Sequence, residues 1–232
     1  MNKLNHSTLG NIVVVENVRA RRVTMRVRDG VIVASIPVGM NVDELAAIID
    51  ENEKKLHTLK QKATPTLLLR CGYEKSSNGL TIRIVEHSEK STLVRYRDNV
   101  LSIVCPHNSD YNSKELQTKI KVGLERGLKY YGKHFLPGKV NQLAKQHDIE
   151  IKEVKVTGSR SKWGSCNSKR IINLSCFSLL LPPHLLDYLI LHELTHTFEM
   201  NHSPRFYAKL NQLCGGKHEM LRKELKKEKM LF

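Results

Sequence analysis

Two histidines four residues apart, His192 and His196, constrain this chain more than any other feature of its sequence. On an α-helix such positions lie on one face, so both imidazoles can bind one metal ion. Glu193 sits one step round the helix, where it can act on a metal-bound water without being a ligand itself. The mostly apolar run 185–191 before this motif predicts a helix that packs against a core and begins near Pro183. The pattern indicates a zinc hydrolase.

A third histidine strengthens this interpretation. His202 follows His192 by ten residues, the spacing of the zinc sites of pattern H-E-x-x-H-x-x-G-x-x-H. Glu199 replaces the glycine of that pattern, so we predict that the chain turns at Asn201 instead, because asparagine tolerates positive φ. The alternative third ligand is Glu219, which would come from a later helix. His202 is preferred because Ser203 and Pro204 predict a capped helix immediately after it.

Charge and size restrict the partners. The 232 residues suffice for a sizeable core, and 38 Lys+Arg against 23 Asp+Glu give a net charge of +15. Such a charge permits weak, sequence-independent binding of nucleic acid or another polyanion, although a basic surface without such a partner is the alternative. The arginine-rich stretch 19–28 is the first candidate surface, and the lysine-rich segment 217–229 is the second.

The sequence also predicts a compartment. No apolar run approaches the 18 residues of a membrane span, and the first residues show no signal-peptide core, so no membrane partner is expected. The cysteine count is odd and includes no C-x-x-C pair, which favours free thiols in a reducing cytoplasm. The five cysteines are Cys71, Cys105, Cys166, Cys176 and Cys214.

The first half of the chain is rich in predicted strands, with one helix. Alternating or continuous apolar runs predict strands at 11–15, 23–28, 31–37, 80–85, 92–96 and 100–106, and a helix at 41–62. Residues 63–80, which include Pro65, are expected to form loops and turns. The units 23–37 and 92–106 resemble each other around the turns at Asp29-Gly30 and Asp98-Asn99. We interpret them as two hairpins with the same turn chemistry, and a structural duplication is the alternative.

A long helix at 112–147, kinked or interrupted at Gly138, opens the second half. Strands are predicted at 151–156 and 170–175, and the only tryptophan, Trp163, lies between them. We expect Trp163 to pack in the core, with direct substrate contact as the alternative. An edge strand in this region could bind an extended peptide through backbone hydrogen bonds.

Three segments together resemble the YgjP-like metallopeptidase family and, more distantly, the SprT-like zinc proteases. They are Trp163-Gly164-Ser165-Cys166, His192-Glu193-Leu194-Thr195-His196 and Asn201-His202-Ser203-Pro204-Arg205-Phe206. The match is strong over about 150–215 and looser in the N-terminal half. The family's tryptophan usually follows an arginine, whereas Lys162 here keeps the charge but not the bidentate geometry.

The resemblance implies an α+β fold: a β-rich region with one helix at 1–110, then a minimal zincin-like metallopeptidase domain with an active-site helix at 111–232. It implies Zn²⁺ held by His192, His196 and His202, with Glu193 as catalytic base. Peptide bonds would be hydrolysed by a metal-activated water. Trp163, Lys162 and Tyr207 are candidate substrate-binding residues, and Lys162 and Tyr207 are candidates for stabilising the oxyanion.

Two other functions remain open. Metal-activated water and positive charge also suit hydrolysis of a nucleotide or another phosphorylated small molecule. A binding module with a purely structural metal is the third possibility, but such a site would not need Glu193 beside its first histidine. Assays against peptide and nucleotide panels distinguish the first two functions.

Overall fold

The computed structural model describes residues 2–28, 30–62, 67–88 and 90–230. The turn predicted at Asp29 and the loop predicted at Pro65 therefore fall, at those positions, outside the described residues. The chain forms two compact units, Met1–Leu67 and Leu68–Phe232, each with its own hydrophobic core. This boundary differs from the division at 110 predicted from the sequence. The α+β fold class is confirmed.

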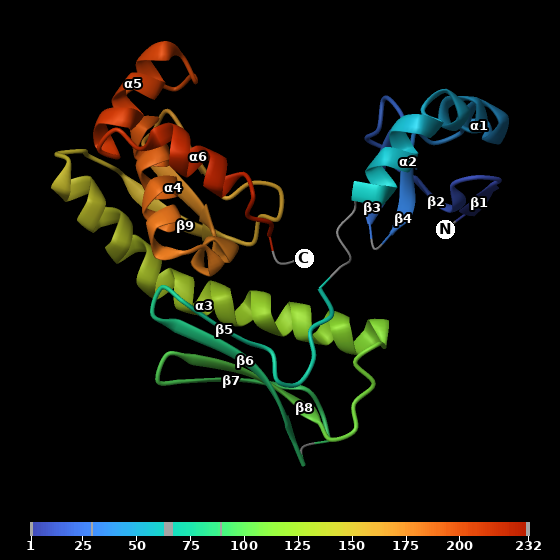
Figure 1. Ribbon diagram of the computed structural model, residues 1–232, viewed down its shortest axis with the longest axis horizontal. Helices are drawn as coiled ribbons and strands as arrows, with labels where there is room; N and C mark the ends of the chain where they lie inside the picture. The colour runs from blue at the N-terminus through green and yellow to red at the C-terminus, as the bar shows by residue number, and fades with distance from the viewer. Residues whose placement is uncertain (1, 29, 63–66, 89, 231–232) are drawn as a thin grey trace. The chain divides into compact units, whose positions relative to one another are not determined.

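The first unit is a four-stranded sheet followed by two helices (Figure 1). Its strand order is β1-β2-β4-β3, in which β2 and β4 are parallel and the two outer pairs are antiparallel. Alternate residues of β2 and β4 are buried, and they pack with Leu45, Ile49 and Leu56 of the helices. The elements are β1 (Asn2–His6), β2 (Gly10–Glu16), β3 (Thr24–Arg28), β4 (Val31–Ile36), α1 (Val42–Glu51) and α2 (Glu53–Lys62).

The helix predicted at 41–62 is divided at Asn52. The backbone N–H of Asn52 donates to the carbonyls of Asp50 and Ile49, and the Asn52 side-chain amide donates to the carbonyl of Ile48 at 2.9 Å. A side chain that takes a backbone carbonyl in this way competes with the helical ladder. The single predicted helix is therefore two helices of ten residues each.

The second unit opens with a sheet that has the pairing pattern of the first. Its order is β5-β6-β8-β7, with β6 and β8 parallel and both outer pairs antiparallel. The likeness seen in the sequence thus extends beyond two hairpins to a whole four-stranded arrangement, and a structural duplication explains it better than shared turn chemistry. The strands are β5 (Glu74–Ser77), β6 (Leu80–His87), β7 (Leu93–Arg97) and β8 (Val100–Pro106).

This sheet is joined to the rest of the second unit by the turn between β5 and β6. Asn78, at φ 51°, donates from its side-chain amide to the carbonyls of Leu179 and Leu181 at 2.9 and 2.8 Å. Its own carbonyl accepts from the hydroxyl of Tyr131 at 2.8 Å. These bonds, together with a shared core, group residues 68–110 with the C-terminal part of the chain rather than with the first unit.

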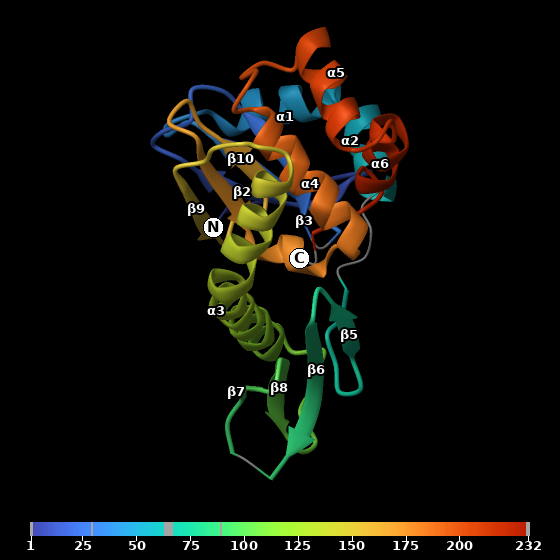
Figure 2. The same ribbon diagram turned by 90° about the vertical axis from the view of Figure 1, so that its left-hand side faces the viewer.

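The remainder of the second unit contains a three-stranded sheet and the helices that carry the predicted metal motif (Figure 2). The sheet order is β10-β11-β9, with β10 antiparallel and β9 parallel to β11. The elements are α3 (Lys114–Gln146), β9 (Glu153–Thr157), β10 (Gly164–Cys166), β11 (Ile171–Ser175), the 3₁₀ helix η1 (Cys176–Leu180), α4 (Pro183–Thr195), α5 (Pro204–Leu213) and α6 (His218–Leu225).

Helix α3 contacts both sheets of the second unit. It is one continuous helix that runs through Pro137 and Gly138, so the interruption predicted at Gly138 does not occur. Gly123 and Gly127 are buried where α3 meets the β5–β8 sheet, and a Cβ atom on Gly127 would lie 3.0 Å from Cγ of Leu101 and closer still to its methyl groups. Glycine therefore permits the close approach of helix and sheet. None of the described helices is both long and apolar enough to cross a membrane.

Candidate metal centre

Helix α4 is buried along most of its length and positions the metal motif. Pro183 occupies its first turn, and its apolar residues belong to the core of the second unit. The helix ends at Thr195, so His196 is its C-cap, and the chain turns through hydrogen bonds from 197–199 back to Leu194 and Thr195. The predicted turn at Asn201 is therefore wrong in position, because the helix has already ended at Thr195.

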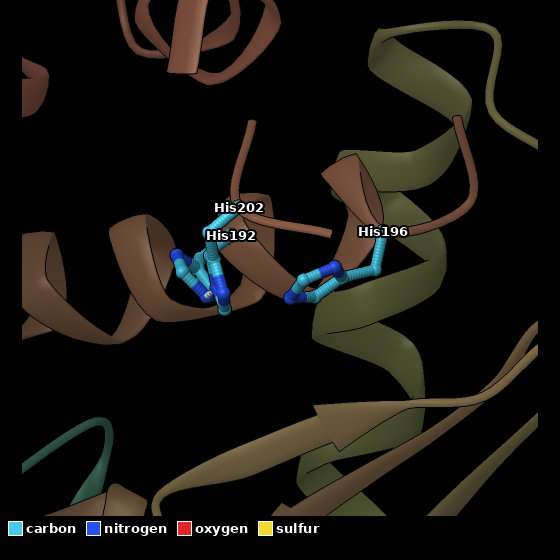
Figure 3. A group of neighbouring side chains, drawn as sticks. All are labelled: His192, His196 and His202. Carbon is cyan, nitrogen blue, oxygen red and sulfur yellow. Dashed lines mark hydrogen bonds between the residues drawn. The ribbon is translucent and has the colours of Figure 1, made fainter. Parts of the chain in front are cut away.

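The three predicted histidine ligands lie together (Figure 3). One ligand atom from each of His192, His196 and His202 lies within 4.8 Å of the other two. The Nε2 atoms of His192 and His202 are 3.1 Å apart. Nitrogens bound to one tetrahedral zinc ion at about 2.0–2.1 Å would be separated by about 3.3 Å. The His192–His202 pair therefore already has the spacing for such an ion, and His196, whose ligand atom lies within 4.8 Å of both, completes the set.

An aromatic ring supports the three imidazoles. Phe206 of α5 is fully buried, and its ring centroid lies 5.0, 4.6 and 4.7 Å from those of His192, His196 and His202. The helix that carries Phe206 begins as predicted, because the Ser203 hydroxyl accepts from the backbone N–H of Phe206 at 3.3 Å. The N-cap thus fixes Phe206 against the three imidazoles.

Hydrogen bonding and burial determine the protonation of the cluster. His196 Nδ1 lies 3.1 Å from the carbonyl oxygen of Glu199, to which it can donate, leaving Nε2 free to bind a metal. Burial, with the neighbouring His196 and His202, lowers the pKa of His192 to about 3. The imidazole of His192 is therefore neutral at pH 7, as a metal ligand must be.

The carboxylate of Glu193 is buried beside the histidines. Its exposed fraction is 4%, and burial raises its pKa to about 8, against the opposing effects of the Lys162 charge and a hydrogen bond from the Cys166 backbone. No hydrogen-bond partner for Oε2 is found in the described part of the chain. A Cβ atom on Gly164 would lie 2.6 Å from Oε1, so glycine in β10 leaves the space that this carboxylate occupies.

A cavity of about 540 Å³ opens beside the cluster. All three candidate substrate-binding residues, Trp163, Lys162 and Tyr207, line this cavity. Trp163 also packs on the core, as expected, whereas Lys162 is exposed. The Tyr207 ring stacks on that of His202, with the ring centroids 6.1 Å apart. The loop that carries Lys162 and Trp163 is anchored to α3 by an ion pair between Arg160 and Glu125, and to β11 by a hydrogen bond from Ser175 N to Trp163 O.

Helix α6 and the residues after it contribute to the same cavity and were not predicted from the sequence. His218, Arg222, Leu225, Lys226 and Glu228 line it. The Tyr188 hydroxyl lies 3.1 Å from Nδ1 of the buried His218, and burial raises the pKa of Tyr188 to about 12 and lowers that of His218. Glu219, the alternative third ligand, pairs with Arg222 at 3.4 Å and does not join the histidine cluster among the described residues.

Comparison with known proteins agrees with the geometry. A buried glutamate next to three clustered histidines, the first and second on an H-E-x-x-H motif, defines the class of metallohydrolases. A model of the YgjP-like metallopeptidase domain matches residues 21–228, and the chain therefore belongs to the YgjP-like metallopeptidase family.

Two solved structures are similar to part of the chain. The metallopeptidase zymogen of Pyrococcus abyssi abylysin is 16% identical, covering 37% of this chain and 87% of its own, with a TM-score of 0.34. The metallopeptidase zymogen of Methanocaldococcus jannaschii jannalysin is 24% identical, covering 37% and 92%, with a TM-score of 0.30. No curated protein matches the sequence.

Proposed function

We propose that this metallopeptidase is zinc-dependent and hydrolyses peptide bonds, with His192, His196 and His202 as metal ligands and Glu193 as general base. The single observation that carries the proposal is the buried Glu193 carboxylate, one oxygen of which has no partner among the described residues, beside three clustered imidazoles. A structural metal site closed by four ligands would have no use for such a group, whereas a catalytic site needs both an open coordination position and a base.

The donor set fits zinc. Imidazole nitrogens suit zinc well, and a set of three leaves one tetrahedral position open. A bound zinc ion would supply Lewis acidity and would lower the pKa of water from 15.7 to about 7. Because His192 is neutral at pH 7 and His196 can donate Nδ1–H to a carbonyl, the Nε2 atoms of these two imidazoles can accept a cation without losing a proton.

Glu193 would move the protons of the reaction. Burial raises the pKa of this carboxyl group to about 8, so it can hold a proton, and a bound cation would lower that pKa and favour the carboxylate. The carboxylate would accept a proton from the attacking water and deliver it to the leaving amine. Lys162 and Tyr207, both on the cavity wall, are the candidates for stabilising the negative charge on the carbonyl oxygen.

Strand β10 would position the substrate. It lies at one edge of the three-stranded sheet, and its Gly164 adjoins the Glu193 carboxylate. An extended peptide that adds to this edge by backbone hydrogen bonds would pass the metal cluster and Trp163. The alternative reaction, hydrolysis of a nucleotide or another phosphorylated molecule, would not use the strand edge.

The test is the Glu193→Gln variant, which keeps the shape of the side chain but cannot accept a proton. We expect it to bind zinc like the wild type and to lose about 10²–10⁴-fold in peptide hydrolysis, the usual contribution of a general base. The measurements are zinc content by elemental analysis and turnover of peptide and nucleotide panels by both proteins. Cleavage of nucleotides but not peptides by the wild type would establish the alternative, and undiminished peptide turnover in the variant would remove Glu193 as base.

We further propose a cytoplasmic location and a weak polyanion contact. All five cysteines are free, as a reducing compartment would leave them. Arg19, Arg21, Arg22 and Arg26 are exposed on the first unit and offer charge to phosphates. A gel-shift titration with duplex DNA at low and near-physiological salt tests the contact, and absence of a complex at low salt would rule it out.

A further inference from the structure

The wall of the cavity contributed by α6 presents a hydrogen-bond donor that the proposed reaction does not use. His218 is 4% exposed and is one of the residues that line the cavity, and its Nδ1 lies 3.1 Å from the Tyr188 hydroxyl. Among the described residues the Tyr188 hydroxyl has no other hydrogen-bond acceptor, so it is best satisfied by donating to Nδ1. The other nitrogen, Nε2, then carries the proton and acts as a donor.

This donor has no hydrogen-bond partner among the described residues. Oε1 of Glu219 lies 3.5 Å from it, and the same oxygen lies 3.4 Å from Nη1 of Arg222. Both distances are long for a charged hydrogen bond, and the Glu219 side chain is 66% exposed. His218 and Arg222 therefore converge on one carboxylate oxygen that neither binds well.

The charges around this point favour an anion. Arg222, Lys226 and Lys162 line the cavity, against Glu228 and the buried Glu193. The guanidinium of Arg222 lies over the Tyr207 ring at 5.7 Å, which holds it at the cavity wall. An arginine beside a fixed N–H donor is suited to a planar carboxylate.

We propose that His218 and Arg222 bind a carboxylate of the peptide substrate, displacing Glu219, so that the cavity selects peptides with a negative charge near the scissile bond. This inference rests on the proposed peptidase function. The carboxylate could be the C-terminus of the peptide or the side chain of an acidic residue, and a cavity of about 540 Å³ has room for one or two residues.

Two pairs of acetylated tripeptides test the proposal. The first pair, acetyl-Ala-Leu-Ala with a free C-terminus and its amide, differs only in the terminal carboxylate. The second pair, the amides of acetyl-Ala-Leu-Glu and acetyl-Ala-Leu-Gln, differs only in the side-chain carboxylate. Affinities are measured by the fluorescence of Trp163, the only tryptophan, in zinc-loaded Glu193→Gln protein, in which turnover is suppressed.

We expect the charged member of at least one pair to bind about tenfold more tightly than its neutral twin, as one charge-assisted hydrogen bond provides. Arg222→Gln should abolish this preference and Glu219→Gln should increase it. Arg205→Gln, which removes the same charge from an exposed position outside the cavity lining, should leave it unchanged. Zinc itself can attract a carboxylate, but that attraction would not depend on Arg222.

Equal affinities within both pairs, no measurable binding, or a preference that survives Arg222→Gln would overturn the proposal. Melting temperatures of the variants show whether they are folded, and Arg222 is partly exposed, so its replacement should be tolerated. Cleavage of the same peptides by wild-type protein is measured separately. If the protein prefers the charged peptides but cleaves none of them, the peptidase function alone is refuted. If it binds charged and neutral peptides equally and cleaves them equally, the carboxylate site alone is refuted.

Discussion

At the scale of single residues, contacts with neighbouring groups hold the three imidazoles of the cluster in place. Phe206 packs against all three imidazoles, and the Glu199 carbonyl orients His196. Side chains that are already held in place lose little conformational entropy when a ligand arrives. Removal of one imidazole should therefore weaken zinc binding directly, without unfolding the site.

The third ligand is the position to test. His202→Ala should lower zinc affinity by at least about tenfold, because two histidines alone leave two coordination positions to solvent. Glu219→Ala is the matched control for the alternative ligand and should retain zinc, because its carboxylate pairs with Arg222. Competition with a zinc-binding dye measures both affinities. If Glu219→Ala lowered zinc affinity more than His202→Ala did, the third coordination position would be assigned to Glu219.

Gly164 should prove as necessary as the polar residues. A methyl group at this position would meet the Glu193 carboxylate at 2.6 Å, so Gly164→Ala should displace that carboxylate and lower kcat by at least about tenfold while zinc content is unchanged. Ser165→Ala, at the next position of β10, has a side chain on the opposite face of the strand and should be nearly neutral. Steady-state kinetics and elemental analysis check both, and equal activity of the two variants would show that the carboxylate tolerates the methyl group.

The motif residues were predictable because their spacing encodes their geometry. The cluster of His192, His196 and His202, and the N-cap at Ser203, follow from positions in the sequence alone. Phe206 lies in a segment that resembles the family and Tyr188 in the apolar run 185–191, but nothing in a sequence states which ring will lie against an imidazole. His218 and Arg222 gave even less signal, because they reach the cavity only through the packing of α6 on α4.

At the scale of elements, the strands that were not predicted from the sequence are edge strands, which are stabilised by pairing with an adjacent strand. β1 and β5 have the mostly polar sequences Asn-Lys-Leu-Asn-His and Glu-Lys-Ser-Ser, and β10 has only three residues. All three lie at sheet edges and are held by pairing with β2, β6 and β11. Periodicity reports burial of one face, so a short polar edge strand carries no such signal.

Helix α3 depends on glycine where it meets the β5–β8 sheet. Gly127→Ala would place a methyl group into the fully buried side chain of Leu101, and we expect a loss of about 1–3 kcal/mol in the free energy of unfolding. Gly138→Ala, in the same helix, meets nothing within 4 Å and should gain about 0.5–1 kcal/mol. Urea denaturation of the two variants measures the difference, and a neutral Gly127→Ala would mean that the sheet moves to accommodate the methyl group.

At the scale of the whole molecule, two cores divide the chain. The core of the first unit contains only residues before 57, and that of the second only residues from 69 onward. The predicted boundary at 110 followed the end of the strand-rich sequence. The observed boundary follows burial, because the β5–β8 sheet packs on α3, which no local pattern reveals.

Residues 68–232 should therefore fold without the first unit. We expect a protein truncated to this range to unfold in one cooperative transition and to bind zinc with the affinity of the full chain, because every residue of the metal cluster and cavity lies within it. Calorimetry and zinc titration of the truncated protein test this. Loss of zinc binding with the fold intact would mean that the first unit supports the site.

The repeated sheet also determines an order of events during translation. In each copy the central parallel pair joins strands about twenty residues apart, Ile12 with Ile32 and Ile82 with Leu101, so each sheet can close as soon as its own segment has left the ribosome. The first unit can be complete before α4 has been synthesised. The proposed zinc site includes His202, which is synthesised after both four-stranded sheets, so zinc would bind a chain in which those sheets can already have formed.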